Sequence, residues 1–100
     1  MATFCYVWEL LVHPGHVEAF EAAYGPEGEW VQLFRQDASY LGTDLLRDCH
    51  NPGRFLTIDR WATEEACLAF RVRFQSELAE LDARCGRYTV EERHLGDFDV

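Results

Sequence analysis

The sequence predicts an α+β fold of the ferredoxin-like type, in which a four-stranded antiparallel sheet carries its helices on one face. Strand-like and helix-like segments alternate in the order β-α-β-β-α-β, which is the pattern of this fold. The 100 residues are enough for one domain, 1–100, and they contain no linker or internal repeat. Hydrophobic residues make up 48% of the chain and aromatic residues 14%, which excludes intrinsic disorder.

The first half of the chain predicts a strand followed by two short helices. Residues 4–12 are rich in β-branched and aromatic side chains, and a His-Pro-Gly turn signal follows them. Apolar side chains with helical spacing predict a helix at 16–24. The Gly-Pro-Glu-Gly segment at 25–28 breaks this helix, so a second short helix is expected at 29–36.

The second half predicts a hairpin, a long helix and a last strand. Strands are expected at 41–48 and 54–61, joined by an Asn-Pro-Gly turn. Thr63 is a suitable N-cap for a helix that continues to the glycine at position 86. One continuous apolar stripe marks this helix and consists of Cys67, Phe70, Phe74, Leu78 and Leu81. Charged residues suit the last strand, at about 87–95, to the edge of the sheet.

The first strand is apolar on both of its faces. Its even-numbered residues run from Phe4 to Val12, and its odd-numbered residues include Cys5, Val7 and Leu11 around a single Glu9. Right-handed crossovers place the helices on the same side of the sheet, so the chain leaves the other side uncovered. Because a monomer with so much exposed apolar surface would aggregate, we expect a homodimer in which the uncovered sheet faces pack together.

The charge of the chain argues against two classes of partner. The net charge is −9, from 18 acidic residues against nine arginines and no lysine. An acidic surface repels phosphate backbones and anionic lipids, so we expect neither nucleic acid nor a membrane as partner. No apolar run approaches the roughly 18 residues needed to span a bilayer, and the N-terminus has no basic signal-peptide region. We therefore expect a cytoplasmic protein.

The cysteines and histidines indicate neither disulfides nor a metal site. The four cysteines, at 5, 49, 67 and 85, are widely spaced and form no CxxC motif, so free buried thiols are expected. Two disulfides are the alternative. His13 and His16 flank a tight turn and Cys49 is adjacent to His50, but neither pair has the spacing of a zinc site. We expect no metal.

Two stretches carry a resemblance to a known family. The run Tyr6–Phe20 (YVWELLVHPGHVEAF) resembles the start of antibiotic biosynthesis monooxygenase (ABM) domains, in which an apolar strand leads through Pro-Gly into a helix. Leu56–Trp61 (LTIDRW), followed by Thr-Glu-Glu-Ala, is similar to the third strand and following helix start of that family. The resemblance implies a dimeric α+β barrel with a ligand between sheet and helices of one subunit. Family activities are diverse, so the fold does not settle function.

The resemblance also allows the haem-degrading branch of the family to be tested. Those members use an asparagine, a tryptophan and an iron-ligating histidine, whose positions correspond here to Trp8, Phe70 and Glu80. All three are different, and a carboxylate is a poor substitute for the usual axial ligands of haem. We expect no haem and no other cofactor.

The strand at 54–61 carries the candidate catalytic residues, Asp59 and Trp61. Cofactor-free oxygenation needs a substrate that can be deprotonated and a dry pocket beside it. Period-two alternation places Thr57, Asp59 and Trp61 on one face. Burial beside aromatic rings would raise the pKa of Asp59 and allow it to act as a base. The alternatives are an ordinary ion pair between Asp59 and an arginine, and simple core packing for Trp61.

Further residues are candidates for substrate binding. Such pockets are mostly apolar with a few polar groups. Five aromatic side chains could line a flat pocket, or they could simply fill the core and the dimer interface; they are Tyr6, Trp8, Tyr24, Trp30 and Phe34. The candidate substrate-binding residues are Tyr6, Trp8, Tyr24, Trp30, Thr57 and Phe70.

The histidines lie in a loop or on the edge strand, and the sequence is compatible with more than one function. His13 and His16 are interpreted as solvated loop residues, whereas His94 and Arg93 lie on the edge strand and could reach a partner subunit. Three functions fit the sequence. The first is a cofactor-independent monooxygenase for a small aromatic or quinol-type substrate. The others are a non-enzymatic ligand-binding or stress-related homodimer, and a cyclase or isomerase that uses Asp59 or a histidine as base.

Overall fold

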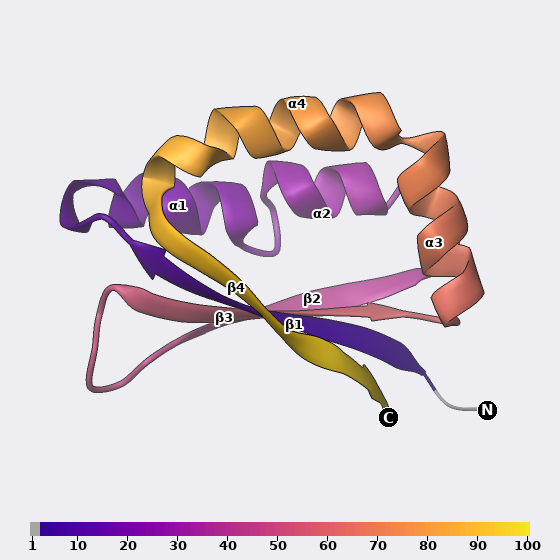
Figure 1. Cartoon of the computed structure of the whole chain (residues 1–100), viewed down its shortest axis with the longest axis horizontal. Coiled ribbons are helices and arrows are strands. Elements are labelled where there is room, and N and C mark those ends of the chain that lie inside the picture. The colour runs from indigo at the N-terminus through magenta and orange to yellow at the C-terminus, as the bar shows by residue number, and fades with distance from the viewer. Residues whose placement is uncertain (1–2) are drawn as a thin grey trace.

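The computed structural model describes residues 3–100 and confirms the predicted fold class (Figure 1). Four antiparallel strands form one sheet in the order β2-β3-β1-β4. They are β1 (Phe4–Val12), β2 (Tyr40–Arg47), β3 (Arg54–Trp61) and β4 (Thr89–Asp99). The helices are α1 (Val17–Tyr24), α2 (Glu29–Phe34), α3 (Glu64–Arg73) and α4 (Gln75–Cys85), with short 3-10 turns at Pro14–His16 and Gly86–Tyr88. All of the helices lie on one side of the sheet.

Strand β3 shows the alternation that the sequence predicts. Phe55, Thr57, Asp59 and Trp61 are buried and face the helices, whereas the residues between them are only half-buried. Arg60 accordingly lies on the opposite face. Strands β1 and β2 flank β3, with Tyr6 and Thr43 as its partners at Asp59. This register places three polar side chains next to one another beneath the helices.

The core consists of two clusters, one at each end of the sheet. One cluster contains Leu10, Phe20, Phe55 and Leu81, and the other is built around Trp61 together with Phe4, Tyr6, Phe34, Cys67 and Phe70. Trp8, Trp30 and Leu33 pack against both clusters. The space between the clusters is therefore bounded by large aromatic rings rather than closed by a single continuous core.

The long helix expected after Thr63 is broken, which corrects the prediction of one continuous helix. Thr63 caps α3 as predicted, because its hydroxyl accepts a hydrogen bond from the amide of Ala66 at 3.1 Å. Phe74 then leaves the helical conformation, with φ −109° and ψ 26°, and α4 continues in a different direction (Figure 1). The rings of Phe70 and Phe74 stack at 4.6 Å across the bend. No proline or glycine marks the break, so tertiary packing and not local propensity explains it.

Strand β4 is an edge strand, as predicted, but it is longer than expected and contains a bulge. Val7 pairs with Gly96 and Trp8 pairs with His94, so Leu95 is an extra residue. Gly96 has φ +157°, a conformation that residues with a side chain rarely adopt. The bulge places His94 and Asp97 on the same face of the strand, toward the helices.

The sheet face opposite the helices, called here the open face, mixes apolar and charged side chains. The carboxylate of Glu9 forms salt bridges with Nε of Arg54 at 2.6 Å and with Nη2 of Arg93 at 3.0 Å. Arg60 forms a salt bridge with Asp44 at 2.7 Å. Apolar residues surround these ion pairs and include Val7, Leu11, Leu46, Leu56, Ile58 and Phe98. Leu46 and Phe98 are about half exposed. None of the helices in residues 3–100 covers this face.

The cysteines are free, as expected for a chain without a disulfide framework. Cys5, Cys67 and Cys85 are buried, whereas Cys49 is exposed in the turn after β2, which differs from the expectation that all would be buried. Within residues 3–100, no group of three or more metal-ligating side chains comes together. None of the helices described is long and apolar enough to cross a membrane.

Candidate functional site

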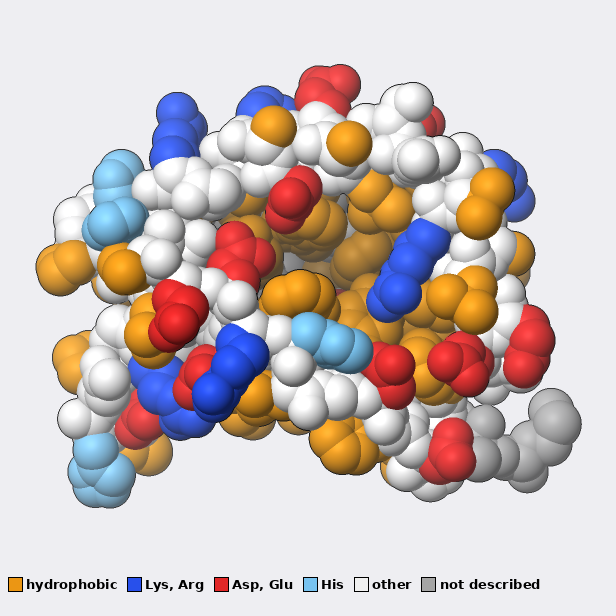
Figure 2. Space-filling model, in the orientation of Figure 1, with side chains coloured by type: hydrophobic (Ala, Val, Ile, Leu, Met, Phe, Trp, Pro, Cys, Tyr) orange, Lys and Arg blue, Asp and Glu red, His pale blue; other side chains and the backbone are white. Residues whose placement is uncertain are grey.

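A cavity of about 300 Å³ lies between the sheet and the helices. Figure 2 shows it as a hollow with hydrophobic side chains on its floor, and charged side chains and a histidine at its rim. This volume is at the lower end of the range typical for small-molecule sites. Its lining residues are Tyr6, Trp8, Leu10, Tyr24, Trp30, Phe34, Thr57, Asp59, Trp61, Phe70, Arg71, Leu78, Asp82, Glu92 and His94.

The structure brings all eight candidate site residues around this one cavity. They come from five different elements: Tyr6 and Trp8 from β1, Tyr24 from α1, Trp30 from α2, Thr57, Asp59 and Trp61 from β3, and Phe70 from α3. The strand residues line the floor because they alternate toward the helices. The helix residues lie above them on the apolar faces that pack on the sheet.

Asp59 is a buried carboxyl group at the floor of the cavity, with 6% of its surface exposed. Its Oδ1 accepts a hydrogen bond of 2.5 Å from the hydroxyl of Thr43 on the neighbouring strand. Burial raises the pKa of Asp59 to about 6, although the Thr43 hydrogen bond and the charges of Arg71 and Arg60 oppose this shift. The predicted ion pair between Asp59 and an arginine is wrong, because no arginine in residues 3–100 lies within 4.0 Å of this carboxylate.

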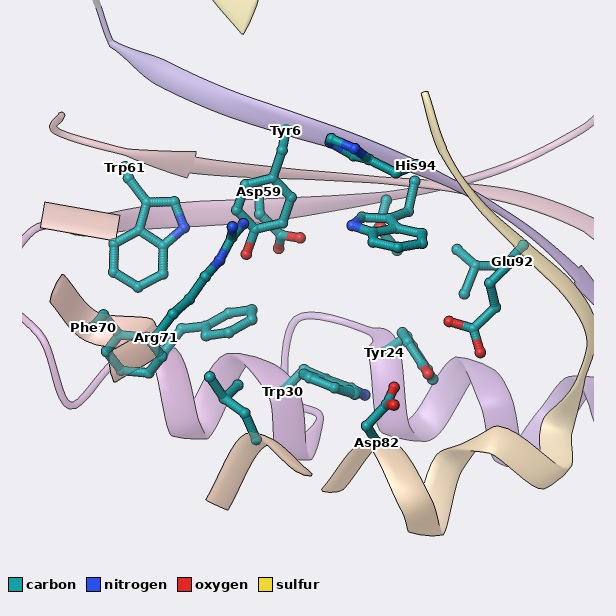
Figure 3. Close-up of a pocket in the computed structure, with 15 residues that line it drawn as sticks. Tyr6, Tyr24, Trp30, Asp59, Trp61, Phe70, Arg71, Asp82, Glu92 and His94 are labelled. Atoms are coloured by element: carbon teal, nitrogen blue, oxygen red, sulfur yellow. The ribbon is translucent and has the colours of Figure 1, made fainter. Parts of the chain in front are cut away.

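Arg71 is the cationic side chain that lines the cavity, and the sequence reasoning missed it. Its guanidinium lies over the ring of Tyr6, 4.8 Å from the ring centroid. Figure 3 shows the guanidinium pointing toward Tyr6 and Asp59. Burial raises the pKa of the Tyr6 hydroxyl, and the nearby Asp59 charge adds to that effect, so Tyr6 remains a neutral donor. Arg71 follows Phe70 in α3, and the side chains of both residues line the cavity.

Nε1 of Trp61 and Nε1 of Trp30 are buried, and neither makes a hydrogen bond of good geometry among the described residues. The Tyr6 hydroxyl lies near the first nitrogen, and the Tyr24 hydroxyl and the Cys85 thiol lie near the second. Trp61 is fully buried, and its ring centroid lies 5.0 Å from that of Phe70 and 5.6 Å from that of Phe34. In Figure 3 its nitrogen lies on the side of the ring that faces Tyr6 and Asp59. A buried donor without an acceptor is destabilising by roughly 1–3 kcal/mol. A ligand oxygen in the cavity could remove that penalty.

The far end of the cavity has a different character. Figure 3 shows Tyr24 and Trp30 there, close to the carboxylates of Asp82 and Glu92. Tyr24 is buried, and burial raises the pKa of its hydroxyl, with the Glu92 and Asp82 charges adding to the effect. This end is therefore acidic, whereas the end beside Asp59 contains the guanidinium of Arg71.

His94 lines the rim of the cavity, where it is exposed, and its contact with a partner subunit stays a prediction. Its ring lies 5.3 Å from the ring of Trp8, and its Nε2 is 2.9 Å from Oδ1 of Asp97. The bulge in β4 is responsible for this orientation. His13 and His16 are exposed near the first turn and do not line the cavity, in agreement with their interpretation as loop residues.

The residue positions that the haem-degrading relatives use do not form a haem site here. Trp8 and Phe70 line the cavity, but Glu80 is exposed on α4 and is not part of the lining. The donor chemistry at these three positions thus does not fit an axial ligand. The arrangement instead combines a buried carboxyl, a guanidinium and an indole N–H around a small aromatic cavity.

These features define the class of the protein: helices cover one face of a sheet, and an aromatic cavity lies between the two layers. Residues 3–75 match the model of the antibiotic biosynthesis monooxygenase (ABM) family, so the chain belongs to this family. A comparison with curated proteins gave no match.

Solved structures with the same fold extend over nearly the whole chain. A protein of Bordetella bronchiseptica, provisionally assigned as an antibiotic biosynthesis monooxygenase, has a TM-score of 0.75 at 20% identity, covering 98% of this chain and 96% of its own. SnoaB, a cofactor-independent oxygenase from Streptomyces nogalater, has a TM-score of 0.73 at 17% identity, covering 98% and 92%. A conserved protein of Methanosarcina mazei has a TM-score of 0.73 at 13% identity, covering 98% and 92%. At these identities the likeness shows the fold alone.

Proposed function

We propose that the chain is a cofactor-independent monooxygenase that acts on a small aromatic or quinol-type substrate in the cavity. The observation that carries this proposal is the buried carboxyl of Asp59 beside Arg71 and the unpartnered Nε1 of Trp61. A base, a cation and a donor in a largely apolar space suit the removal of a proton from a phenol and the stabilisation of the resulting oxyanion. Membership of the ABM family and the fold shared with SnoaB support it.

The proposed reaction needs no group beyond the substrate, O₂ and the side chains of the cavity. Asp59 takes the phenolic proton, and the guanidinium of Arg71 and the N–H of Trp61 stabilise the oxyanion. The electron-rich anion then reduces O₂ and bonds to it at a ring carbon, and Asp59 returns its proton to the peroxide that forms. Loss of water from the resulting hydroperoxide leaves a carbonyl at that carbon, so a phenol and O₂ become a quinone and water. The substrate supplies all four electrons that reduce O₂.

The roles of the other lining residues follow from their positions. Tyr6, Trp8, Tyr24, Trp30 and Phe70 form the aromatic walls that hold a flat ring, and Thr57 offers a hydroxyl on the floor. The walls also keep water from the anion, which strengthens its interactions with the charged groups. Asp59 and Trp61 are the proposed catalytic residues because they meet the reacting oxygen.

We also propose that the protein works as a homodimer through the open face. The apolar side chains of Leu46, Leu56, Ile58 and Phe98 on that face stay partly exposed, and none of the helices in the described residues covers them. Packing two such faces together buries them and leaves the cavity of each subunit intact on the other side of the sheet.

The activity is tested with 1-naphthol, a phenol whose oxygenation gives 1,4-naphthoquinone and water. The purified protein is incubated with 1-naphthol under ¹⁸O₂, and the quinone is analysed by mass spectrometry, with hydroquinones as a second substrate panel. We expect one ¹⁸O atom per quinone, formed faster than in buffer. Asp59→Asn should lower the rate by roughly 10²–10⁴-fold. Glu80→Gln, which changes an exposed acid outside the cavity, is the matched control and should leave the rate unchanged.

Rates equal to buffer with every phenol, or equal rates for the wild type and Asp59→Asn, would exclude the proposal. Two other outcomes identify the alternative functions. Saturable binding of the phenol without any turnover indicates a ligand-binding protein, which the two unpartnered indole donors would also suit. A product formed without O₂ indicates a cyclase or isomerase that uses Asp59 as its base.

A further inference from the structure

Asp59 is connected to the edge of the sheet by two hydroxyl groups on β2. The Thr43 hydroxyl lies 2.5 Å from Oδ1 of Asp59, and the Tyr40 hydroxyl lies 2.5 Å from the oxygen of Thr43. Thr43 is the direct cross-strand partner of Asp59, so the two side chains share one face of the sheet. Because β2 is an edge strand, the chain of hydroxyls leads from a buried carboxyl to the margin of the molecule.

The number of hydrogens fixes the direction of these hydrogen bonds. An ionised Asp59 only accepts, so Thr43 must donate its single hydroxyl hydrogen to it, and Tyr40 must donate to Thr43. A proton taken up on Oδ2 leaves these bonds in place, because Oδ1 continues to accept from Thr43. The two hydroxyl groups therefore hold Asp59 in the same position in both of its protonation states.

The same contacts divide the two oxygens of Asp59 between different tasks. Among residues 3–100, Thr43 is the hydrogen-bond donor to this carboxyl, and it uses Oδ1. Oδ2 has no such partner and remains available to a ligand in the cavity, which Asp59 lines. A fixed carboxyl with one free oxygen is better placed to receive a proton than one that can rotate.

We propose that Thr43 and Tyr40 are positioning residues that hold Oδ1 of Asp59, so that Oδ2 stays free to take the proton of the substrate. The proposal rests on the role of Asp59 as base in the proposed function. One O–H bond of the substrate breaks and one O–H bond forms at Oδ2, while Thr43 and Tyr40 keep their own hydrogens. No oxidant or further reactant takes part in this step.

Besides Thr43, several groups face Asp59 but make no hydrogen bond to its carboxyl among residues 3–100. Tyr6 faces Asp59 from β1, Arg71 and Cys67 face it from α3, and Arg60 lies on its own strand. Arginine does not release its proton in proteins, and the thiol of Cys67 has a raised pKa because it is buried. Arg35 and Asp44 are the charged groups near the outer end at Tyr40, where they border solvent.

The first experiment needs no substrate. The carboxyl carbon of Asp59 is titrated by NMR in the wild type and in Thr43→Val, Thr43→Ser and Tyr40→Phe. We expect Thr43→Val to raise the titration midpoint by about one pH unit, because a hydrogen bond to the charged form is lost. Thr43→Ser should restore the wild-type midpoint, since it keeps the hydroxyl. An unchanged midpoint in Thr43→Val overturns the proposal.

The second experiment measures the oxygenation of 1-naphthol in the same variants at pH 8, where Asp59 is ionised. Thr43→Val should lower the initial rate severalfold, because the carboxylate is no longer held in place, and Thr43→Ser should restore it. Tyr40→Phe keeps the Thr43–Asp59 bond and should have a smaller effect. Equal rates for the wild type and Thr43→Val overturn the proposal. If the wild type itself oxidises nothing, the proposed function fails, whereas the titration still decides whether Thr43 controls Asp59.

Discussion

The ring of His94 packs against the ring of Trp8, tilted by 37°, at the rim of the cavity because β4 contains one residue more than the strand beside it. The two rings are 5.3 Å apart, and Leu95 is the residue that has no partner on β1. Without this bulge, strict alternation would turn His94 and Asp97 to opposite faces. The bulge instead joins them by a contact of 2.9 Å on the cavity side.

The first prediction concerns Gly96, which permits the bulge. Gly96→Ala should destabilise the fold by about 1–3 kcal/mol, because alanine is strained at φ +157° and its Cβ would lie 3.0 Å from Phe98. Thermal unfolding should show a melting temperature lower by roughly 5–20 °C. Gly15→Ala is the control, because a Cβ at that position would have nothing within 4 Å. Equal melting temperatures for the two variants would contradict the argument.

A second prediction follows from the burial of Asp59. Its folded-state pKa is about 6, raised from 3.8, so the native state holds a proton that the unfolded chain has already lost between these values. Stability therefore falls as pH rises through this window, and it stays lower above pH 6. Asp59→Asn removes the ionisation and should stabilise the protein at pH 7.5 by up to about 3 kcal/mol relative to its effect at pH 4. Urea unfolding at both pH values measures the difference; the same effect at each pH would refute it.

The third prediction concerns the pH dependence of activity. Asp59 acts as a base only when it is ionised, so the rate of 1-naphthol oxygenation should level off above its pKa of about 6. Below that pH the rate should fall about tenfold per pH unit. Initial rates between pH 4.5 and 8, corrected for buffer, give the profile. A rate independent of pH over this interval would show that another group removes the proton.

A fourth prediction separates the packing of Trp61 from its donor. Trp61→Ala should destabilise the protein by about 3–5 kcal/mol, because a fully buried ring is lost. Trp61→Phe keeps most of the ring and removes an unpartnered N–H, so it should be much less destabilising. Isothermal titration with 1-naphthol should nevertheless show weaker binding to Trp61→Phe. Unchanged affinity would mean that Nε1 does not contact the ligand.

The fifth prediction tests the open face. Light scattering at micromolar concentration should give the mass of a dimer for the wild type. Ile58→Glu places an uncompensated charge at the centre of the open face and should yield monomers. Val72→Glu is the control, because Val72 is 76% exposed on α3, away from that face. A wild-type monomer, or a dimer that survives Ile58→Glu, would rule out this interface.

The repeating patterns of the sequence were sufficient to predict the floor of the cavity. A strand permits only two directions for its side chains, so Thr57, Asp59 and Trp61 had to lie together on one face. The Asn-Pro-Gly turn then indicated that β2 and β3 are neighbours. Because the helices can pack on only one side, the aromatic residues of α1 and α2 had to lie above that floor.

Arg71 and His94 could not be found in this way. Arg71 lies outside the apolar stripe of its helix, so the helical pattern did not indicate that its long side chain reaches Tyr6. His94 reaches Trp8 only because of the extra residue in β4. The glycine at 96 is the one local signal, since a glycine within a strand often marks a bulge. The partner of Asp59 was also missed, because Thr43 looks like any strand residue until the register with β3 is known.

The strand order separates the entrance of the cavity from the support of its carboxylate. His94 borders the opening beside β4, whereas the hydroxyl groups that hold Asp59 lie on β2, and these strands form opposite margins of the sheet. A substitution that widens the entrance for a larger ring would thus leave the surroundings of the carboxylate unchanged. The choice of substrate and the strength of the base can therefore change independently of each other.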